Sequence, residues 1–256
     1  MESKELSIVI VTFKSELKIF DCLEAIPRYI KVIVVENSNN EFFKKEIESK
    51  YNNVNCILTG ENKGYAAANN IGLTNVETKF ALVLNPDAIL QKNAVENFFK
   101  ITIKNDDFWL IGPGNDQNVN LDFKNENTIE VDNLKGFAIF FNMTKFNNKF
   151  FDENFFLYFE EIDLCKQVIK KNGKIYLDQR IQIKHQGASS VNKMSILELE
   201  KNRNWHWMWS TFYFHKKYKG FLIALIIITP KFLSLLIKIF FYTLIFSKKT
   251  SVVYFF

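Results

Sequence analysis

The sequence predicts an α/β fold in which a mostly parallel sheet is flanked by helices, with a hydrophobic helical tail at the C-terminus. Short apolar runs alternate with segments of helical periodicity along the first 110 or so residues. This alternation is typical of parallel strands joined by right-handed crossovers. Composition then changes abruptly near residue 219, where a long apolar stretch begins. We therefore expect a sheet-bearing domain over 1–218 and a membrane-associating tail over 219–256.

Composition excludes some classes of function. The net charge of +5 is mild and no dense basic arm is present, so nucleic acid is not an expected partner. The three cysteines are scattered without zinc-ligand spacing, as in a reduced cytosolic protein. We expect no signal peptide, because the first apolar run, 7–13, is too short for one and is instead typical of a strand.

The first half of the chain contains five apolar runs with helices between them. The run from Leu6 is continuous and β-branched, which indicates a buried strand. Polar residues follow the first two strands, so Thr12 and Glu36 are expected at the ligand-binding edge of the sheet. The predicted strands are 6–13, 32–36, 54–58, 80–84 and 108–111, and the predicted helices lie near 17–26, 42–47, 64–72 and 94–103.

Gly64 opens a helix that contains three successive alanines. Small residues at a helix N-terminus allow close approach of a phosphate. A glycine turn followed by a tightly packed helix is the alternative explanation of the same residues.

The run 80–84 leads directly into Asn85-Pro86-Asp87. Proline cannot donate a ladder hydrogen bond, so the strand must end here. Asp87 is thereby placed just beyond the carboxyl end of a central strand, where ligands bind in open α/β sheets. A carboxylate at this position suits a divalent cation, although Asp is also a favoured helix cap.

The second half contains further candidates. Gly136 begins an apolar run, 134–141, and marks either a close approach of the backbone to a ligand or a bulge. The carboxylates Glu160, Glu161 and Asp163 start an amphipathic helix, where they favour the helix dipole or supply a general base.

Strands are expected at 174–177 and 181–185, and His185 ends the second of them before a glycine-containing turn. An aromatic helix is expected over 195–218.

The tail is long enough to span a bilayer, but Pro230, Lys231 and Lys238 interrupt it. Lysines also flank both of its ends. We therefore favour a helix in the membrane plane, or a shallow hairpin bent at Pro230, over a simple span. A core helix of a soluble domain fits less well, because almost every side of the helix is apolar.

Taken together, these motifs resemble the family 2 glycosyltransferases with a GT-A fold, and within them a bacterial rhamnosyltransferase-like branch. The resemblance covers roughly residues 5–215. The segments that carry it are 7–13, 34–38, 62–72, 84–87, 136–138, 151–153, 156–164 and His185.

The resemblance implies an inverting transfer from a nucleotide-sugar donor. Asp87 would bind Mg²⁺ or Mn²⁺ at the diphosphate, His185 would complete that site, and Glu161 would be the general base. The nucleotide-binding residues would be Thr12, Glu36, Asn62, Gly64 and Asn85. The residues bordering the donor or acceptor sugar would be Gly136, Phe137, Ala138, Glu160 and Asp163.

Three positions depart from the family pattern. Glu36 and Glu161 stand where the family usually has Asp, and Gln167 stands where it often has Arg. The longer side chains move a carboxylate by about one bond, and the loss of Arg removes an ion pair behind the base.

The resemblance further implies rhamnose transfer from dTDP-rhamnose to a glycan or polyprenyl-linked acceptor, in cell-surface polysaccharide synthesis. The expected location is the cytoplasmic face of the plasma membrane. Alternatives are another UDP- or GDP-sugar donor, or a non-catalytic protein that binds a sugar nucleotide. A nucleotidyltransferase fits less well, because the sequence lacks a glycine-rich, basic N-terminal phosphate loop.

Overall fold

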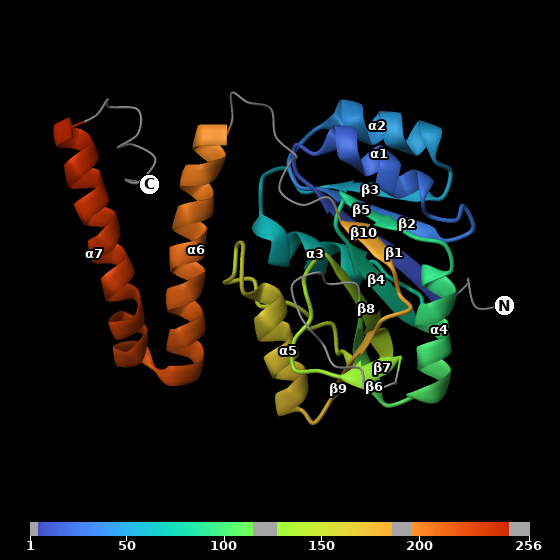
Figure 1. Ribbon diagram of the computed structural model, residues 1–256. Coiled ribbons are helices and arrows are strands. Elements are labelled where there is room, and N and C mark those ends of the chain that lie inside the picture. The colour runs from blue at the N-terminus through green and yellow to red at the C-terminus, as the bar shows by residue number, and fades with distance from the viewer. Residues whose placement is uncertain (1–4, 115–126, 186–195, 246–256) are drawn as a thin grey trace. The chain divides into compact units, whose positions relative to one another are not determined.

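The computed structural model describes residues 5–114, 127–185 and 196–245 (Figure 1). The chain divides into two compact units, one of Met1–Asp152 with Glu161–Ser190 and one of Glu153–Glu160 with Val191–Phe256. This division places the aromatic helix expected over 195–218 in the same unit as the tail. Composition instead placed the boundary between domain and tail at 218/219. Residues 246–256 of the expected tail lie outside the described part of the chain.

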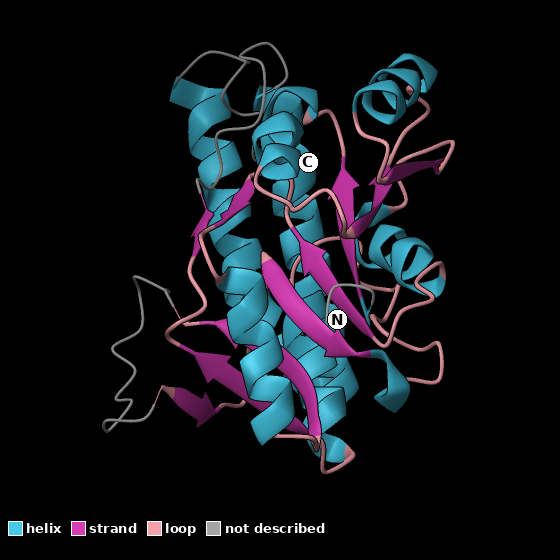
Figure 2. Ribbon diagram, turned by 90° about the vertical axis from the view of Figure 1, so that its right-hand side faces the viewer, coloured by secondary structure: helices cyan, strands magenta, loops and turns pink. Residues whose placement is uncertain are grey.

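Within the described residues, the first unit contains an eight-stranded sheet of order β3-β2-β1-β4-β8-β6-β9-β7 and a two-stranded sheet of β5 and β10. The strands of the large sheet are β1 (Leu6–Thr12), β2 (Lys31–Glu36), β3 (Val54–Leu58), β4 (Phe80–Leu84), β6 (Phe108–Pro113), β7 (Thr128–Glu130), β8 (Ala138–Asn142) and β9 (Lys174–Asp178). The small sheet pairs β5 (Ala88–Leu90) with β10 (Ile183–His185). Figure 2 shows the strands of both sheets in magenta.

The prediction of a mostly parallel sheet flanked by helices is confirmed. Strand β1 pairs in parallel with β2 and β4, as do β2 with β3 and β6 with β9. Strand β8 is antiparallel to both β4 and β6, and β7 is antiparallel to β9. The expected strand over 134–141 is shorter, because its ladder begins only at Ala138.

The side chains of each strand alternate between two cores, as the period of two requires. Ile8 and Ile10 lie in one core, and Val9 and Val11 lie in the other. The helices of the first unit are α1 (Glu16–Glu24), α2 (Glu41–Lys50), α3 (Gly64–Thr74), α4 (Ala94–Lys104) and α5 (Glu160–Lys170), although the first residue of α5 belongs to the second unit. Helices α1, α2 and α4 pack on the first face, and α3 and α5 pack on the second.

The second unit contains α6 (Ile196–Lys219) and α7 (Phe221–Ile245). Gly220 joins them at a φ of 89°, a left-handed conformation that glycine adopts without strain. Among the described residues, no helix combines the length and the hydropathy required to cross a bilayer.

The alanine-rich helix α3 lies very close to the sheet. A Cβ at Gly72 would overlap a methyl group of Val9 and would lie 3.2 Å from Cγ2 of Val35. Ala66 and Ala68 are fully buried in the same core. The small residues of this helix therefore serve its packing on β1 and β2, as the second interpretation of the sequence held.

We expect Gly72→Ala to lower the free energy of unfolding by about 1 kcal/mol. Overpacking costs about 1–3 kcal/mol, and the better helix propensity of alanine offsets up to about 1 kcal/mol of that cost. Urea denaturation would measure the change. In a double-mutant cycle, Val9→Ala should cost less in the Gly72→Ala background than alone, and additive effects would contradict the overlap.

Candidate active site

The candidate site is built at the carboxyl end of β4. The Asn85 N–H donates to the Phe137 carbonyl at 2.8 Å, which continues the β4–β8 pairing by one bond. The Ala88 N–H then donates back to the Asn85 carbonyl at 3.0 Å and closes a turn around Pro86. Strand β5 follows Asp87 directly, and helix α4 begins only at Ala94. Asp87 is therefore not a helix cap, which removes one of the two interpretations of its position.

The small sheet brings His185 to Asp87. Strand β10 runs antiparallel to β5, with His185 opposite Ala88. The Nε2 atom of His185 lies 3.3 Å from Oδ1 of Asp87, and the His185 ring stacks on Phe137 with ring centroids 4.7 Å apart. Burial acts to raise the pKa of Asp87, but the hydrogen bond and the charge of His185 outweigh it and hold that pKa below its usual value.

Glu161 faces Gly136, from a segment distant in sequence. A Cβ on Gly136 would lie 3.6 Å from both Cβ and Cγ of Glu161, which is ordinary contact. Gly136 precedes β8 and is not a bulge within it. Burial raises the pKa of Glu161, although backbone N–H groups at the start of α5 act in the opposite direction. A half-buried carboxyl with a raised pKa is suited to accept a proton near neutral pH.

Tyr65, which the sequence did not single out, links three parts of the site. Its hydroxyl lies 2.7 Å from the Gly136 carbonyl and 3.2 Å from Oδ1 of Asn85. A hydroxyl has one proton, so it donates to the closer Gly136 oxygen. Tyr65 thereby fixes the start of α3 against the chain before β8 and the end of β4. The sequence signal that could have identified Tyr65 is an aromatic residue with a hydroxyl group between glycine and alanine residues.

Thr12 and Glu36 lie at the ends of β1 and β2, as predicted. Both are almost fully buried, and the Thr12 Oγ1 atom has no hydrogen-bond partner among the described residues. The Glu36 carboxylate accepts from Ser38 Oγ at 2.6 Å and from the Asn40 N–H at 2.9 Å. In this conformation Glu36 therefore shapes the loop after β2, and its contact with a nucleoside stays a prediction.

Asn37 organises the loop that contains Asn62 and Gly64. Its Nδ2 group donates to Oδ1 of Asn62 at 3.0 Å and to the Gly64 carbonyl at 3.1 Å. Its Oδ1 atom accepts from the Lys63 N–H at 2.9 Å. Gly64 starts α3 with a φ of 81°, which explains the glycine. The sequence placed Asn37 in a polar strand end without assigning it a role.

Three of the predicted sugar-binding residues are buried in this conformation. Ala138 is fully buried in the core, and Asp163 is also fully buried, where it accepts from Nε2 of Gln167. Neither presents surface to a ligand in this conformation. Glu160 is buried as well and belongs to the second unit.

The segment that precedes Glu161 is held by α6, within the second unit. Ser210 Oγ donates to the Leu157 carbonyl at 2.8 Å, and Arg203 Nε donates to the Tyr158 hydroxyl at 2.9 Å. Tyr158 and Phe159 both have positive φ values, 73° and 71°. Such backbone is strained in non-glycine residues and persists only where surrounding contacts impose it.

Asp87 and His185 fit a divalent cation that takes its other ligands from a substrate. Their side chains are partly exposed and carry one carboxylate and one imidazole, both ligands for such ions. In the described part of the chain, no group of three or more His, Cys, Asp or Glu side chains has metal-binding geometry. Affinity for a cation alone should therefore be weak.

The sequence matches a known family and a characterised relative. The family model described as "Glycosyl transferase family 2" matches residues 7–165. Over 198 residues the chain is 26% identical to the low-salt glycan biosynthesis hexosyltransferase Agl10 of Haloferax volcanii, covering 67% of this chain and 64% of that protein.

Solved structures share the fold. TarS of S. aureus matches with a TM-score of 0.57 and 15% identity, over 84% of this chain and 44% of TarS. The mannosyltransferase PcManGT of Pyrobaculum calidifontis, in complex with GDP-Man and Mn²⁺, matches with a TM-score of 0.58 and 13% identity, over 86% of this chain and 68% of that chain.

We expect Tyr65→Phe to lower the free energy of unfolding by about 1 kcal/mol, because the Gly136 carbonyl loses its donor. Chemical denaturation would measure this loss. The control is Tyr29→Phe, since Tyr29 is exposed and its substitution should change stability by less than about 0.5 kcal/mol. Equal effects of the two variants would show that the Tyr65 hydroxyl does not stabilise the site.

Proposed function

Since the chain belongs to glycosyl transferase family 2, we propose that it transfers a sugar from a nucleotide-diphosphate donor to an acceptor hydroxyl with inversion. The observation that carries this proposal is that two carboxylates at one edge of the sheet have pKa values shifted in opposite directions. Asp87 is paired with His185, and Glu161 lies against Gly136 with a raised pKa. Asp87 and Glu161 are therefore suited to different tasks.

The donor would be held along the edge of the large sheet. Thr12 has a buried hydroxyl without a hydrogen-bond partner in the described part of the chain, and it would bond the nucleoside. Asn62 and Gly64 lie at the same edge, where hydrogen bonds from Asn37 hold them. Asp87 and His185 would hold Mg²⁺ or Mn²⁺ at the diphosphate, and this cation would neutralise the charge of the leaving group. The direct contact between Asp87 and His185 would open on binding, because a metal requires the unprotonated imidazole nitrogen.

Glu161 would accept the proton of the acceptor hydroxyl. Inversion requires one base on the face opposite the leaving group. Gly136 leaves room beside the Glu161 carboxyl because it has no side chain there. Replacement of the family's usual Asp by Glu retains the carboxyl chemistry.

For the donor we propose dTDP-rhamnose first, on the resemblance of the sequence motifs, with UDP- and GDP-sugars as alternatives. For the acceptor we propose a glycan or polyprenyl-linked saccharide of cell-surface polysaccharide synthesis. The match to Agl10, a hexosyltransferase of glycan biosynthesis, supports the acceptor class. The match to PcManGT, solved with GDP-Man and Mn²⁺, supports the donor class and the cation.

We expect Glu161→Gln to reduce the rate of sugar transfer by about 10²–10⁴-fold, the usual contribution of a general base. Donor affinity should be unchanged, because the amide has the same size. The matched control is Glu77→Gln, whose side chain is exposed and pairs with Lys31 at the amino end of β2. Near-normal transfer by Glu161→Gln would show that another group is the base.

The pH dependence provides a second readout of the same role. Because burial raises the pKa of Glu161, the transfer rate should rise with pH at a midpoint above the ordinary value of Glu, about 4.3. The Glu161→Gln variant should lose this rise in its residual activity, whereas Glu77→Gln should retain it.

We expect a nucleoside diphosphate and Mn²⁺ together to raise the melting temperature, and either alone to raise it less. Thermal-shift assays with dTDP, UDP and GDP, with and without Mn²⁺, would measure this and identify the nucleotide. In Asp87→Ala and His185→Ala the effect of Mn²⁺ should be reduced, because each variant removes one of the two protein ligands.

A Mn²⁺ effect that persists in Asp87→Ala would contradict the assignment of the cation site. Binding of a nucleotide sugar by the unmodified protein without any transfer or hydrolysis would favour the non-catalytic alternative.

A further inference from the structure

We propose that the hairpin of α6 and α7 is a docking surface for a bilayer that contains anionic lipids. The two helices form a pair held by contacts along their length. The Phe212 and Phe221 rings meet edge to face at 5.9 Å near the turn, and Lys231 Nζ lies 3.6 Å from the centroid of the Trp207 ring. This inference does not depend on the proposed sugar transfer.

Helix α7 presents large apolar side chains to solvent on several sides. Its exposed apolar residues are Phe221, Leu222, Ile223, Leu225, Ile226, Phe232, Leu233, Leu236, Ile237 and Phe240. Leu222 and Ile226 are 73% and 71% exposed, and they lie one turn apart on one side. Soluble monomers rarely expose contiguous apolar surface of this extent, so the helix is expected to be covered by another apolar phase.

The charge of the hairpin indicates that a lipid bilayer covers the exposed apolar side chains of α7. From Arg203 to the end of the sequence, the chain carries lysine and arginine but no aspartate or glutamate. Lys216, Lys217 and Lys219 gather in the last turn of α6, beside the turn of the hairpin. A second copy of the hairpin would bring like charges together, whereas the surface of an anionic bilayer attracts them.

Helix α6 adds side chains suited to the interface of a membrane. Trp205 is 62% exposed, and tryptophan favours the level of the lipid headgroups, where its ring is apolar and its N–H is solvated. Apolar side chains with flanking lysines and tryptophan are typical of helices that bind at this level.

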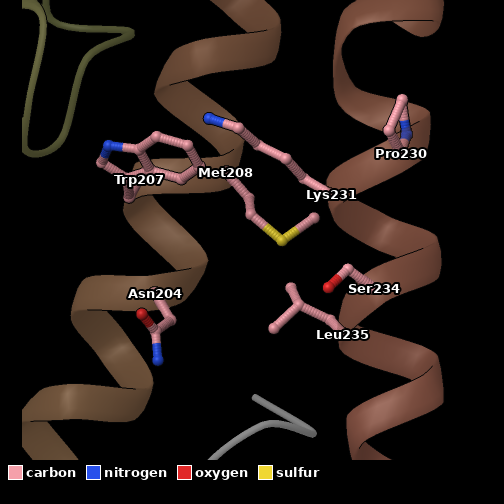
Figure 3. A pocket seen from close by; sticks show the side chains of 7 residues that line it. All are labelled: Asn204, Trp207, Met208, Pro230, Lys231, Ser234 and Leu235. Atoms are coloured by element: carbon pink, nitrogen blue, oxygen red, sulfur yellow. The ribbon is translucent and has the colours of Figure 1, made fainter.

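A cavity of about 410 Å³ lies between the two helices (Figure 3). Its lining residues are Asn204, Trp207, Met208, Pro230, Lys231, Ser234 and Leu235. In Figure 3 the Lys231 side chain reaches across toward Trp207, and the Ser234 hydroxyl lies one turn along α7. The apolar lining and the ammonium group together fit an amphiphile with a phosphate headgroup, so the cavity offers one position for an anionic lipid of the bilayer.

Sedimentation of the full chain with vesicles tests the proposal. We expect binding to phosphatidylcholine vesicles that contain phosphatidylglycerol, weaker binding to phosphatidylcholine alone, and a decrease with added salt. Replacement of Lys216, Lys217 and Lys219 together by Gln should reduce binding on the order of tenfold or more. The matched control replaces the exposed Lys45, Lys92 and Lys104 of the first unit by Gln, with the same change in net charge.

A second pair of variants tests the apolar surface. Leu222→Asn with Ile226→Asn should weaken vesicle binding, whereas Phe42→Asn with Ile103→Asn should not, although these residues of the first unit are equally exposed. Circular dichroism and thermal unfolding of each variant would verify that it folds.

Three results would overturn the proposal. The chain could stay in the supernatant with every vesicle, or bind neutral and anionic vesicles equally and without dependence on the lysines. Light scattering could instead show a dimer that the Leu222→Asn with Ile226→Asn variant dissociates, which would assign the apolar surface to a second copy of the chain.

Discussion

The candidate site depends on the insertion of antiparallel strand β8 between β4 and β6. Pairing of β4 with β8 places Leu84 opposite Ala138, and one further bond joins Asn85 to Phe137. The polar turn after β4 and the Gly136–Phe137 backbone therefore meet at one edge of the sheet. Phe137 then supplies the surface on which His185 stacks, and the Gly136 carbonyl accepts the Tyr65 hydroxyl. An all-parallel sheet would place the beginning of β8 at the opposite edge, far from Asn85.

Two carboxylates at this edge have pKa values that their surroundings shift in opposite directions. Asp87 gains an imidazole neighbour whose hydrogen bond and charge outweigh its burial, so its ionised form is favoured. Burial is the largest influence on the Glu161 carboxyl and raises its pKa, which makes it a stronger base than a solvent-exposed glutamate. Carboxylates separated in this way assume different chemical roles at one pH. The pair is thus consistent with one group that holds charge and another that moves a proton.

The chain segment before the candidate base is held by the hairpin of α6 and α7, within the second unit. The strained residues Tyr158 and Phe159 immediately precede α5, which carries Glu161. Hydrogen bonds from Arg203 and Ser210 of α6 hold this strained segment within the second unit. The segment that leads into α5 therefore belongs to the same unit as the hairpin.

The sequence by itself determined most strands and helices of the first unit, but not the short strand β5, since the apolar period and the position of Pro86 are local signals. It also placed Thr12 and Asp87 at strand ends, because a strand end is readable from the residues around it. Only the tertiary structure decided that β5 follows Asp87, that His185 reaches it, and that Glu161 faces Gly136. Asn37 and Tyr65 became visible in the same way, through bonds to residues 25 to 71 positions away. Such contacts arise from strand pairing and its register, which no local pattern of residues encodes.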